Sequence, residues 1–378
     1  MLKLWQSIGF GVVETSGDAK YGNGAQDSLV VLPVLPAPPL MLNEAASKLW
    51  LKGVDSPVSE ENMNADESQM ISEFVDVGIA CQGQAEYALR VSKPVMTSIE
   101  HELVYALIAR MCVQHSIEYV FVKGPIQYEY GLRDRKHSAD VDVWIDPNRI
   151  QEFLTVMEPW GWSADSERWL HSQFNHSVTL NASTWGCQID VHRYFPGSTM
   201  PPTDAFVAVI GWRDTVHYAG AEALVLSKPA AAVFFALHGL RPESRHRKKT
   251  MARSDAAVAL ELGGPETVRF SKEFACTDVL FDALVEAFPD ESIDRTNRLP
   301  EDWKWRSESN WVRAYFMILK SLKPREWFGF LKDVVRAPAP AGSSGVSGVS
   351  GFKRIIYRVS PQWTKAKTAL NRYLNRKL

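Results

Sequence analysis

The most informative pattern in the chain is an alternation of apolar and polar residues in the stretch HSADVDVWID, residues 137 to 146. Because successive side chains of a β-strand point to opposite faces, this alternation predicts a strand. Asp140 and Asp142 are two positions apart, so both carboxylates would point to the same face. Their Cβ atoms would lie roughly 6.5 to 7 Å apart, close enough for the carboxylates to converge on one cation.

The neighbouring segments predict a mixed sheet around this strand. Residues 99 to 111 carry apolar side chains at helical spacing, YVFV at 119 to 122 is typical of a buried strand, and Pro147 opens a further helix. The stretches FNHSVTLN and CQIDVHRYF, residues 174 to 181 and 187 to 195, predict a hairpin. The order helix, strand, helix, strand, helix, strand, strand indicates a mixed α/β sheet.

Five regions separate by pattern and composition. Residues 1–90 combine an apolar run with two short helical patterns, and residues 97–200 hold the predicted sheet. Residues 205–336 are predicted to be helical, and residues 337–351 form a flexible Pro/Gly/Ser linker. The tail, residues 352–378, has basic residues between apolar ones at helical spacing. Such a helix would suit an anionic membrane surface, its own protein or a partner.

Composition says little about binding partners, but it indicates the cellular compartment. The formal net charge of −2 over 378 residues gives no sign of nucleic-acid binding. The four cysteines form no CxxC pair, which argues against a zinc site or a disulfide framework and favours a reducing compartment. The first residues do not resemble a signal peptide, so we expect a cytoplasmic protein that is peripheral to the membrane if the tail binds there.

Asp190 extends the candidate site to a neighbouring strand. It lies in the second strand of the predicted hairpin, with Gln188 and His192 on the same face. Mg²⁺ prefers oxygen ligands and is usually bound by one or two carboxylates plus substrate phosphates. A third carboxylate would complete a site for two metal ions. The alternative is a half-exposed strand with acidic residues on its solvent face.

The motifs VFVKGPIQYEYGLRDRKHSADVDVWI, IDVHRYF, FFALHGL and SDAAVAL together resemble an uncharacterised bacterial family of minimal nucleotidyltransferases related to DNA polymerase β. The resemblance spans residues 99 to 262 with gaps. It implies an α+β fold with a polymerase-β-like mixed sheet and flanking helices, and a helical C-terminal domain. It also implies Mg²⁺ or Mn²⁺ as cofactor and a nucleoside triphosphate such as ATP as substrate.

The same resemblance implies roles for individual residues. The metal-binding and catalytic triad would be Asp140, Asp142 and Asp190. Phosphate contacts would come from Lys123, Gly124 and a basic residue before the acidic pair, for which Arg133, Arg135 and Lys136 are candidates. Groups outside the triad would be His192, as a hydrogen-bonding partner, and the helical pair His238 and Asp255. One departure is Pro125, which follows the turn glycine and offers neither a hydroxyl nor an N–H donor.

The first region carries a second resemblance. MLNEAASKLW and FVDVGIA, within residues 41 to 80, are similar to the small peptide-binding domain of the pyrroloquinoline quinone D-protein type, a winged-helix-like β/α module. In that family a leader peptide is added as a strand beside a β-hairpin. The alternative is a packing module without a ligand.

These observations lead to one leading hypothesis and two alternatives. The leading one is a magnesium-dependent nucleotidyltransferase that moves a nucleoside monophosphate to a hydroxyl. The acceptor would be a peptide or protein presented by the first region, or a small metabolite or sugar. The first alternative is a non-catalytic peptide-binding scaffold with a decayed transferase core. The second is a phosphotransferase with the same ligands.

Overall fold

The computed structural model describes residues 3–15, 28–84, 89–136, 139–164, 176–242, 251–296, 298–308 and 311–321. The chain divides into two compact units. The first comprises Met1–Asp165, His176–Arg241 and Lys248–Pro300, and the second comprises Ser166–Asn175, Pro242–Arg247 and Glu301–Leu378. The described helices of the second unit are α11 (Glu301–Ser307) and α12 (Trp311–Ser321). The predicted linker and tail, residues 337–378, lie outside the described residues.

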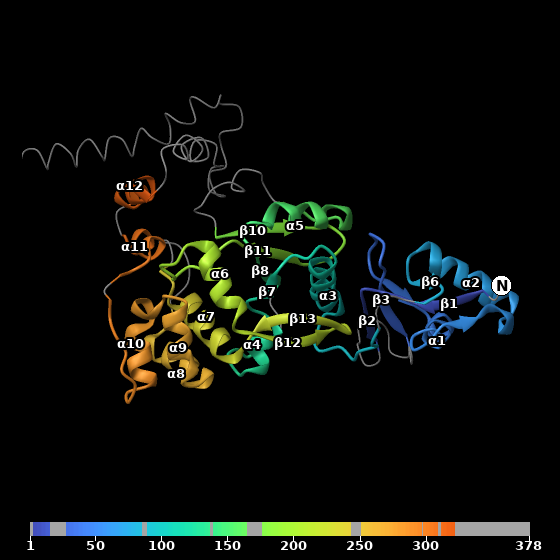
Figure 1. The fold of residues 1–378 in the computed structure, drawn as a ribbon, viewed down its shortest axis with the longest axis horizontal. Coiled ribbons are helices and arrows are strands. Elements are labelled where there is room, and N and C mark those ends of the chain that lie inside the picture. Colours follow the sequence, from blue (N-terminus) through green and yellow to red (C-terminus); the bar gives the residue numbers. More distant parts are fainter. Residues whose placement is uncertain are drawn as a thin grey trace, which may run out of the picture. The chain divides into compact units, whose positions relative to one another are not determined.

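A seven-stranded mixed sheet dominates the described part of the first unit (Figure 1). Its strands, in spatial order, are β12 (Arg213–Tyr218), β13 (Ala221–Leu226), β7 (Tyr119–Phe121), β8 (Asp140–Ile145), β11 (Gln188–His192), β10 (Ser177–Asn181) and β9 (Ser163–Ala164). The pairs β8–β11 and β7–β13 are parallel, and the other neighbours are antiparallel. The α+β class with a mixed sheet is therefore confirmed.

Helices α3 and α5 pack against strands of the sheet that lie on either side of β8, the strand with Asp140 and Asp142. The long helix α3 (Ile99–Gln114) packs against β8, β12 and β13, and α5 (Ile150–Met157) packs against α3 and β9. The short helices of the described residues include α4 (Pro125–Glu129) and the 3₁₀ turns η2 (Glu60–Asn62) and η3 (Glu158–Trp160). The predicted alternation of helices and strands between residues 99 and 195 is present, with β9 as an additional strand.

A helical cluster follows the sheet and contacts it through aromatic side chains. It contains α6 (Pro202–Ile210), α7 (Lys228–Leu240), α8 (Arg253–Gly263), α9 (Glu266–Glu273) and α10 (Thr277–Ala287). The Trp144 ring of β8 lies 6.0 Å from Phe234 of α7 and 6.2 Å from Phe274, between ring centroids. These buried contacts fix β8, which carries two of the three acidic residues, against the helices.

The prediction of an entirely helical region from residue 205 is wrong for residues 213–226, which form the hairpin β12–β13 of the central sheet. Its tight turn contains Ala219 at φ 48° and Gly220 at φ 78°. The alanine-rich sequence of β13 favours a helix locally. Strand pairing with β7 and burial of Ala221, Ala223 and Val225 override that preference.

The N-terminal region forms a small β/α module. One three-stranded sheet has the order β5 (Val58–Ser59), β1 (Leu4–Ser7) and β6 (Ala80–Gln82), and another has the order β2 (Gly11–Glu14), β3 (Leu29–Leu32) and β4 (Leu40–Leu42). The helices are α1 (Glu44–Lys52) and α2 (Ala65–Asp76). Asn43 caps α1, because its side chain accepts a hydrogen bond from Ala46 N at 2.9 Å. Trp5 and Trp50, both fully buried, form the centre of its core.

Backbone contacts join this module to the central sheet and to the segment before α3. Val12 N of β2 donates to Ala219 O at 2.8 Å, and Glu14 N donates to Ser92 O at 2.9 Å. Glu102 of α3 stabilises this junction, since its carboxylate accepts hydrogen bonds from the backbone N–H groups of Val95 and Ala219. No helix in the described ranges is both long enough and apolar enough to cross a membrane.

Candidate active site

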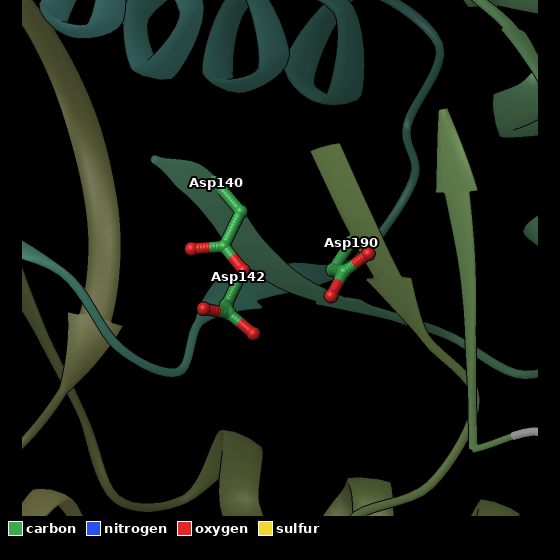
Figure 2. Close-up of side chains that lie close together, drawn as sticks. All are labelled: Asp140, Asp142 and Asp190. Carbon is green, nitrogen blue, oxygen red and sulfur yellow. The ribbon is translucent and has the colours of Figure 1, made fainter. Parts of the chain in front are cut away.

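The three predicted carboxylates meet on one face of the central sheet. Asp140 and Asp142 belong to β8 and Asp190 to β11, and the parallel register sets Asp190 directly opposite Asp142. One ligand oxygen from each of the three carboxylates lies within 4.8 Å of those of the other two. Figure 2 shows the three side chains gathered in one space. The alternation that predicts a shared face in β8 is therefore seen in the structure.

Asp142 is the most deeply buried member of this triad, with 2% of the residue exposed. Its Oδ1 accepts hydrogen bonds from Lys123 Nζ at 2.7 Å and from His192 Nε2 at 2.8 Å. Burial alone would raise the pKa of Asp142, but the Lys123 ammonium and the His192 hydrogen bond outweigh burial. They hold its pKa well below the ordinary value, so this carboxylate is ionised at neutral pH.

His192 is a buried hydrogen-bonding partner of Asp142. It is 1% exposed, and its ring packs against Phe195 at 5.9 Å between centroids. Its other nitrogen, Nδ1, is buried with no hydrogen-bond partner among the described residues. The contact with Asp142 is thus the main polar constraint on the ring.

The turn after β7 admits only glycine at position 124. Gly124 has φ 98°, a conformation that L side chains rarely adopt, and a Cβ there would lie 2.1 Å from the Tyr105 hydroxyl oxygen. Helix α4 begins directly after it with Pro125 at its first position. The backbone therefore approaches Tyr105 closely, but Pro125 contributes no N–H donor at this turn.

Of the three basic candidates before the acidic pair, Arg133 is the half-buried one. Burial and the neighbouring Arg135 lower the pKa of Arg133, while Asp140 and Asp142 act in the opposite direction. Arg135 is exposed, and Lys136 Nζ lies 5.9 Å from the centre of the Tyr128 ring. The sequence left the choice among the three open because all lie within four residues.

The two predicted helical residues are placed differently. His238 is an exposed residue of α7, but loss of solvation at its ring, followed by repulsion from the Lys123 ammonium, lowers its pKa to about 4. It is therefore neutral at pH 7. Asp255 is exposed in the first turn of α8. Within the described part of the chain, Asp255 has no hydrogen bond or ion pair with the triad.

Sequence reasoning missed Thr179. Its hydroxyl, on β10, donates to Asp190 Oδ1 at 2.6 Å, and the antiparallel register sets it directly opposite Asp190. The predicted hairpin contained both residues, but their pairing depends on the register, which the hairpin pattern left undefined. Once the register of β10 against β11 is known, Thr179 is the residue that lies opposite Asp190.

The donor set fits a hard divalent cation. It consists of carboxylate oxygens, which Mg²⁺ and Mn²⁺ prefer. Ligands on opposite sides of Mg²⁺ are about 4.2 Å apart, twice a bond of about 2.1 Å, so oxygens within 4.8 Å need to move only slightly. Lys123 offsets part of the negative charge, and a net negative charge is left for a cation.

Comparison with known proteins finds that the central part of the chain matches one protein family. Residues 96–262 match the family described as "Uncharacterised nucleotidyltransferase". This segment contains the triad, Lys123, Gly124 and Arg133, so the resemblance predicted for residues 99 to 262 is confirmed there. The N-terminal module lies outside the matched segment, and its likeness to the D-protein type stays a prediction. No curated protein matches the chain.

Three solved structures are similar to parts of the chain. A lincosamide antibiotic adenylyltransferase, LnuA, with lincomycin bound is 17% identical, over 44% of this chain and 96% of the other, with a TM-score of 0.27. The antibiotic-resistance factor ANT(2'')-Ia is 11% identical, over 50% and 93%, with a TM-score of 0.28. An antigenic nucleotidyltransferase-like protein from Paracoccidioides brasiliensis is 16% identical, over 51% and 90%, with a TM-score of 0.32.

Proposed function

We propose that the chain is a nucleotidyltransferase that uses Mg²⁺ or Mn²⁺ and moves a nucleoside monophosphate from a triphosphate, such as ATP, to a hydroxyl group. One observation carries the proposal. Asp140, Asp142 and Asp190 converge within 4.8 Å inside the segment that matches a nucleotidyltransferase family.

The described residues suggest a division of roles. Asp140 and Asp142 would hold a divalent cation, which when bound would neutralise phosphate charge. Lys123 and Arg133 would meet the triphosphate, and Gly124 would let the backbone approach it. Asp190 would accept the proton of the acceptor hydroxyl. The hydroxyl oxygen forms a bond to the α-phosphorus, the bond from that phosphorus to the β-phosphate oxygen breaks, and pyrophosphate leaves.

The proposal is tested by transfer of label. The purified chain is incubated with each α-³²P-labelled nucleoside triphosphate, Mg²⁺ or Mn²⁺ and a host extract. Asp140→Asn and Asp142→Asn are compared with Asp134→Asn, an exposed carboxylate in the preceding loop. Label retained by wild type and Asp134→Asn, but lost in both site variants, supports nucleotidyl transfer.

Two other results would favour the alternatives. Transfer of label from the γ-³²P position, with a diphosphate as product, would show a phosphotransferase. If no label moved and no triphosphate bound in the presence of metal, the scaffold hypothesis would replace the enzyme.

We also propose that the N-terminal module binds a peptide along β4, as a partner or as an acceptor. The supporting observation is that β4 is the last strand of its sheet among the described residues, and that Met41 on it is 62% exposed. An open strand edge pairs readily with an extended peptide. A shallow hollow lined by Asn43, Glu44, Ala45 and Lys48 follows the strand directly.

A matched pair of variants tests this binding. Met41→Asp on the edge should abolish binding of a panel of synthetic leader-type peptides to the full chain, measured by fluorescence anisotropy. Leu35→Asp changes a residue that is also exposed but lies before the strand, and should leave binding unchanged. Equal binding by both variants would contradict the edge as the docking site.

A further inference from the structure

A buried tyrosine lies beside the turn that follows β7. Tyr105 of α3 is 2% exposed, and its ring packs against the rings of Phe121 of β7 at 4.4 Å and Tyr218 of β12 at 4.9 Å, between centroids. Its hydroxyl lies directly against the turn, because a Cβ at Gly124 would overlap the hydroxyl oxygen. The two aromatic neighbours therefore hold the phenol in a fixed place at this turn.

The charged groups around the Tyr105 hydroxyl are those of the candidate active site. Burial, followed by Tyr218 and then by the carboxylates of Asp142 and Asp140, raises the pKa of Tyr105 well above its ordinary value. Arg133 acts on it in the opposite direction. The phenol therefore keeps its proton at neutral pH and is able to donate a hydrogen bond.

This donor has no acceptor within the described ranges. No backbone carbonyl and no side chain of those residues accepts a hydrogen bond from the Tyr105 hydroxyl, whose residue has ring contacts with its two aromatic neighbours. A buried tyrosine hydroxyl usually has a partner, because leaving it without one costs free energy. A fixed donor without an acceptor, next to the acidic triad, indicates that the acceptor belongs to a ligand.

The turn itself offers few donors to such a ligand. Pro125 follows the turn glycine and has no N–H group. Lys123 precedes the glycine, and its ammonium is bound to Asp142 at 2.7 Å. A phosphate group at this turn would meet that ammonium and would gain a neutral donor from the Tyr105 hydroxyl, which lies against the same glycine.

We propose that Tyr105 is a triphosphate-binding residue, whose hydroxyl donates a hydrogen bond to a phosphate oxygen at the Gly124 turn and supplies the donor that Pro125 lacks. This inference rests on the proposed nucleotidyl transfer and adds a residue to its phosphate site. A phosphate oxygen carries negative charge, and a hydrogen bond to a charged acceptor is stronger than one between neutral groups. Loss of the hydroxyl should therefore weaken triphosphate binding measurably.

Tyr218 provides a matched control. It is 1% exposed, and its hydroxyl is also buried without a hydrogen-bond partner among the described residues. The carboxylates that act on it are Glu129 and Glu102, and not those of the triad. The atoms nearest to a Cβ at Gly124 all belong to Tyr105. The two phenols are therefore alike in burial and differ in their place relative to the turn.

The experiment measures triphosphate binding to the full chain. ATP, GTP, CTP and UTP are each titrated calorimetrically with Mn²⁺, and the triphosphate that binds is used for the variants. Tyr105→Phe should weaken binding about tenfold, and Tyr218→Phe should bind as the wild type does. In label transfer, Tyr105→Phe should raise the KM for the triphosphate with little change in kcat. Its midpoint of denaturant unfolding should not fall, because the lost hydroxyl has no hydrogen bond within the described residues.

Rescue by a second donor completes the test. Pro125→Ser places a hydroxyl and an N–H at the turn, so it should improve binding more in Tyr105→Phe than in the wild type. Unchanged binding by Tyr105→Phe, equal losses in both tyrosine variants, a lowered unfolding midpoint or equal gains from Pro125→Ser would overturn the inference while leaving nucleotidyl transfer in place. If the wild type binds no triphosphate with metal, the proposed function fails and the inference fails with it.

Discussion

Asp142 and Glu102 are both buried carboxylates of the first unit, but their surroundings stabilise them in different ways. Glu102 is fully buried at the junction of the N-terminal module and the sheet, and it accepts from the backbone N–H groups of Val95, Met96 and Ala219. Burial raises its pKa, and those donors offset burial only in part. Asp142 has Lys123 and His192 as partners, and its pKa is lowered.

The difference separates a carboxylate held by backbone donors from one that belongs to the proposed metal site. Backbone donors connect Glu102 to two chain segments and leave no oxygen directed at a neighbouring acid. At Asp142 both donors share Oδ1, and Asp140 and Asp190 lie beside it. An ionised Asp142 next to two further carboxylates suits the binding of a cation. Unlike that of Glu102, its carboxylate does not connect backbone segments of the described residues through hydrogen bonds to N–H groups.

The largest expected effect is on Asp142. Asp142→Asn removes a negative charge from the proposed metal site and leaves Lys123 without its buried partner, so we expect transfer to fall about a thousandfold. Glu102→Gln should keep the transfer rate within a few-fold. Label-transfer rates of both variants check the comparison. Equal losses in the two would show that Asp142 is only structural.

The next effect concerns the turn beside Asp142, with a control in the same segment. Gly124→Ala combines a positive φ with a contact of 2.1 Å to the Tyr105 hydroxyl oxygen, whereas Gly131 has φ 75° and nothing within 4 Å. We expect Gly131→Ala to lower the free energy of unfolding by about 1 kcal/mol from backbone strain. Gly124→Ala should lower it by about 3 kcal/mol and reduce transfer about a hundredfold.

Denaturant unfolding and label transfer measure both variants. If Gly124→Ala and Gly131→Ala behaved alike, the close approach to Tyr105 would have no role beyond the backbone angle.

A smaller effect is the pH dependence of stability, which should have opposite signs at the two carboxylates. Glu102 has a raised pKa, so above about pH 4 the unfolded chain releases the proton while the folded chain keeps it, and stability falls as pH rises. Asp142 has a lowered pKa, so its stabilisation is present above about pH 4 and is lost as pH falls further.

Denaturant titrations of the wild type and the variants Asp142→Asn and Glu102→Gln at several pH values measure this. On acidification, the difference in unfolding free energy between wild type and Asp142→Asn should shrink, and the difference between wild type and Glu102→Gln should increase. If both differences changed in the same direction with pH, the hydrogen-bonding partners assigned to Asp142 and Glu102 would be contradicted.

The sequence alone predicted the placement of the acidic residues better than it predicted the residues and strands around them. The period-two alternation around Asp140 and Asp142 depends on local geometry, so it predicted their shared face correctly. The neighbours of that face depend on register and on long-range pairing. Thr179 beside Asp190, and β13 paired with β7 about a hundred residues away, follow from tertiary contacts that local patterns do not encode.

The smallest expected effect is at Pro125, where the sequence departs from the pattern of the nucleotidyltransferases that it resembles. Proline suits the first position of α4 but offers no N–H or hydroxyl to a phosphate oxygen. Pro125→Ser restores both groups, and a hydrogen bond of about 1 kcal/mol would tighten triphosphate binding about fivefold. Pro125→Ala restores the N–H alone and serves as the intermediate control. Calorimetric titration of the triphosphate with metal measures the three proteins. Weaker binding by both variants would mean that the proline itself shapes the turn for phosphate.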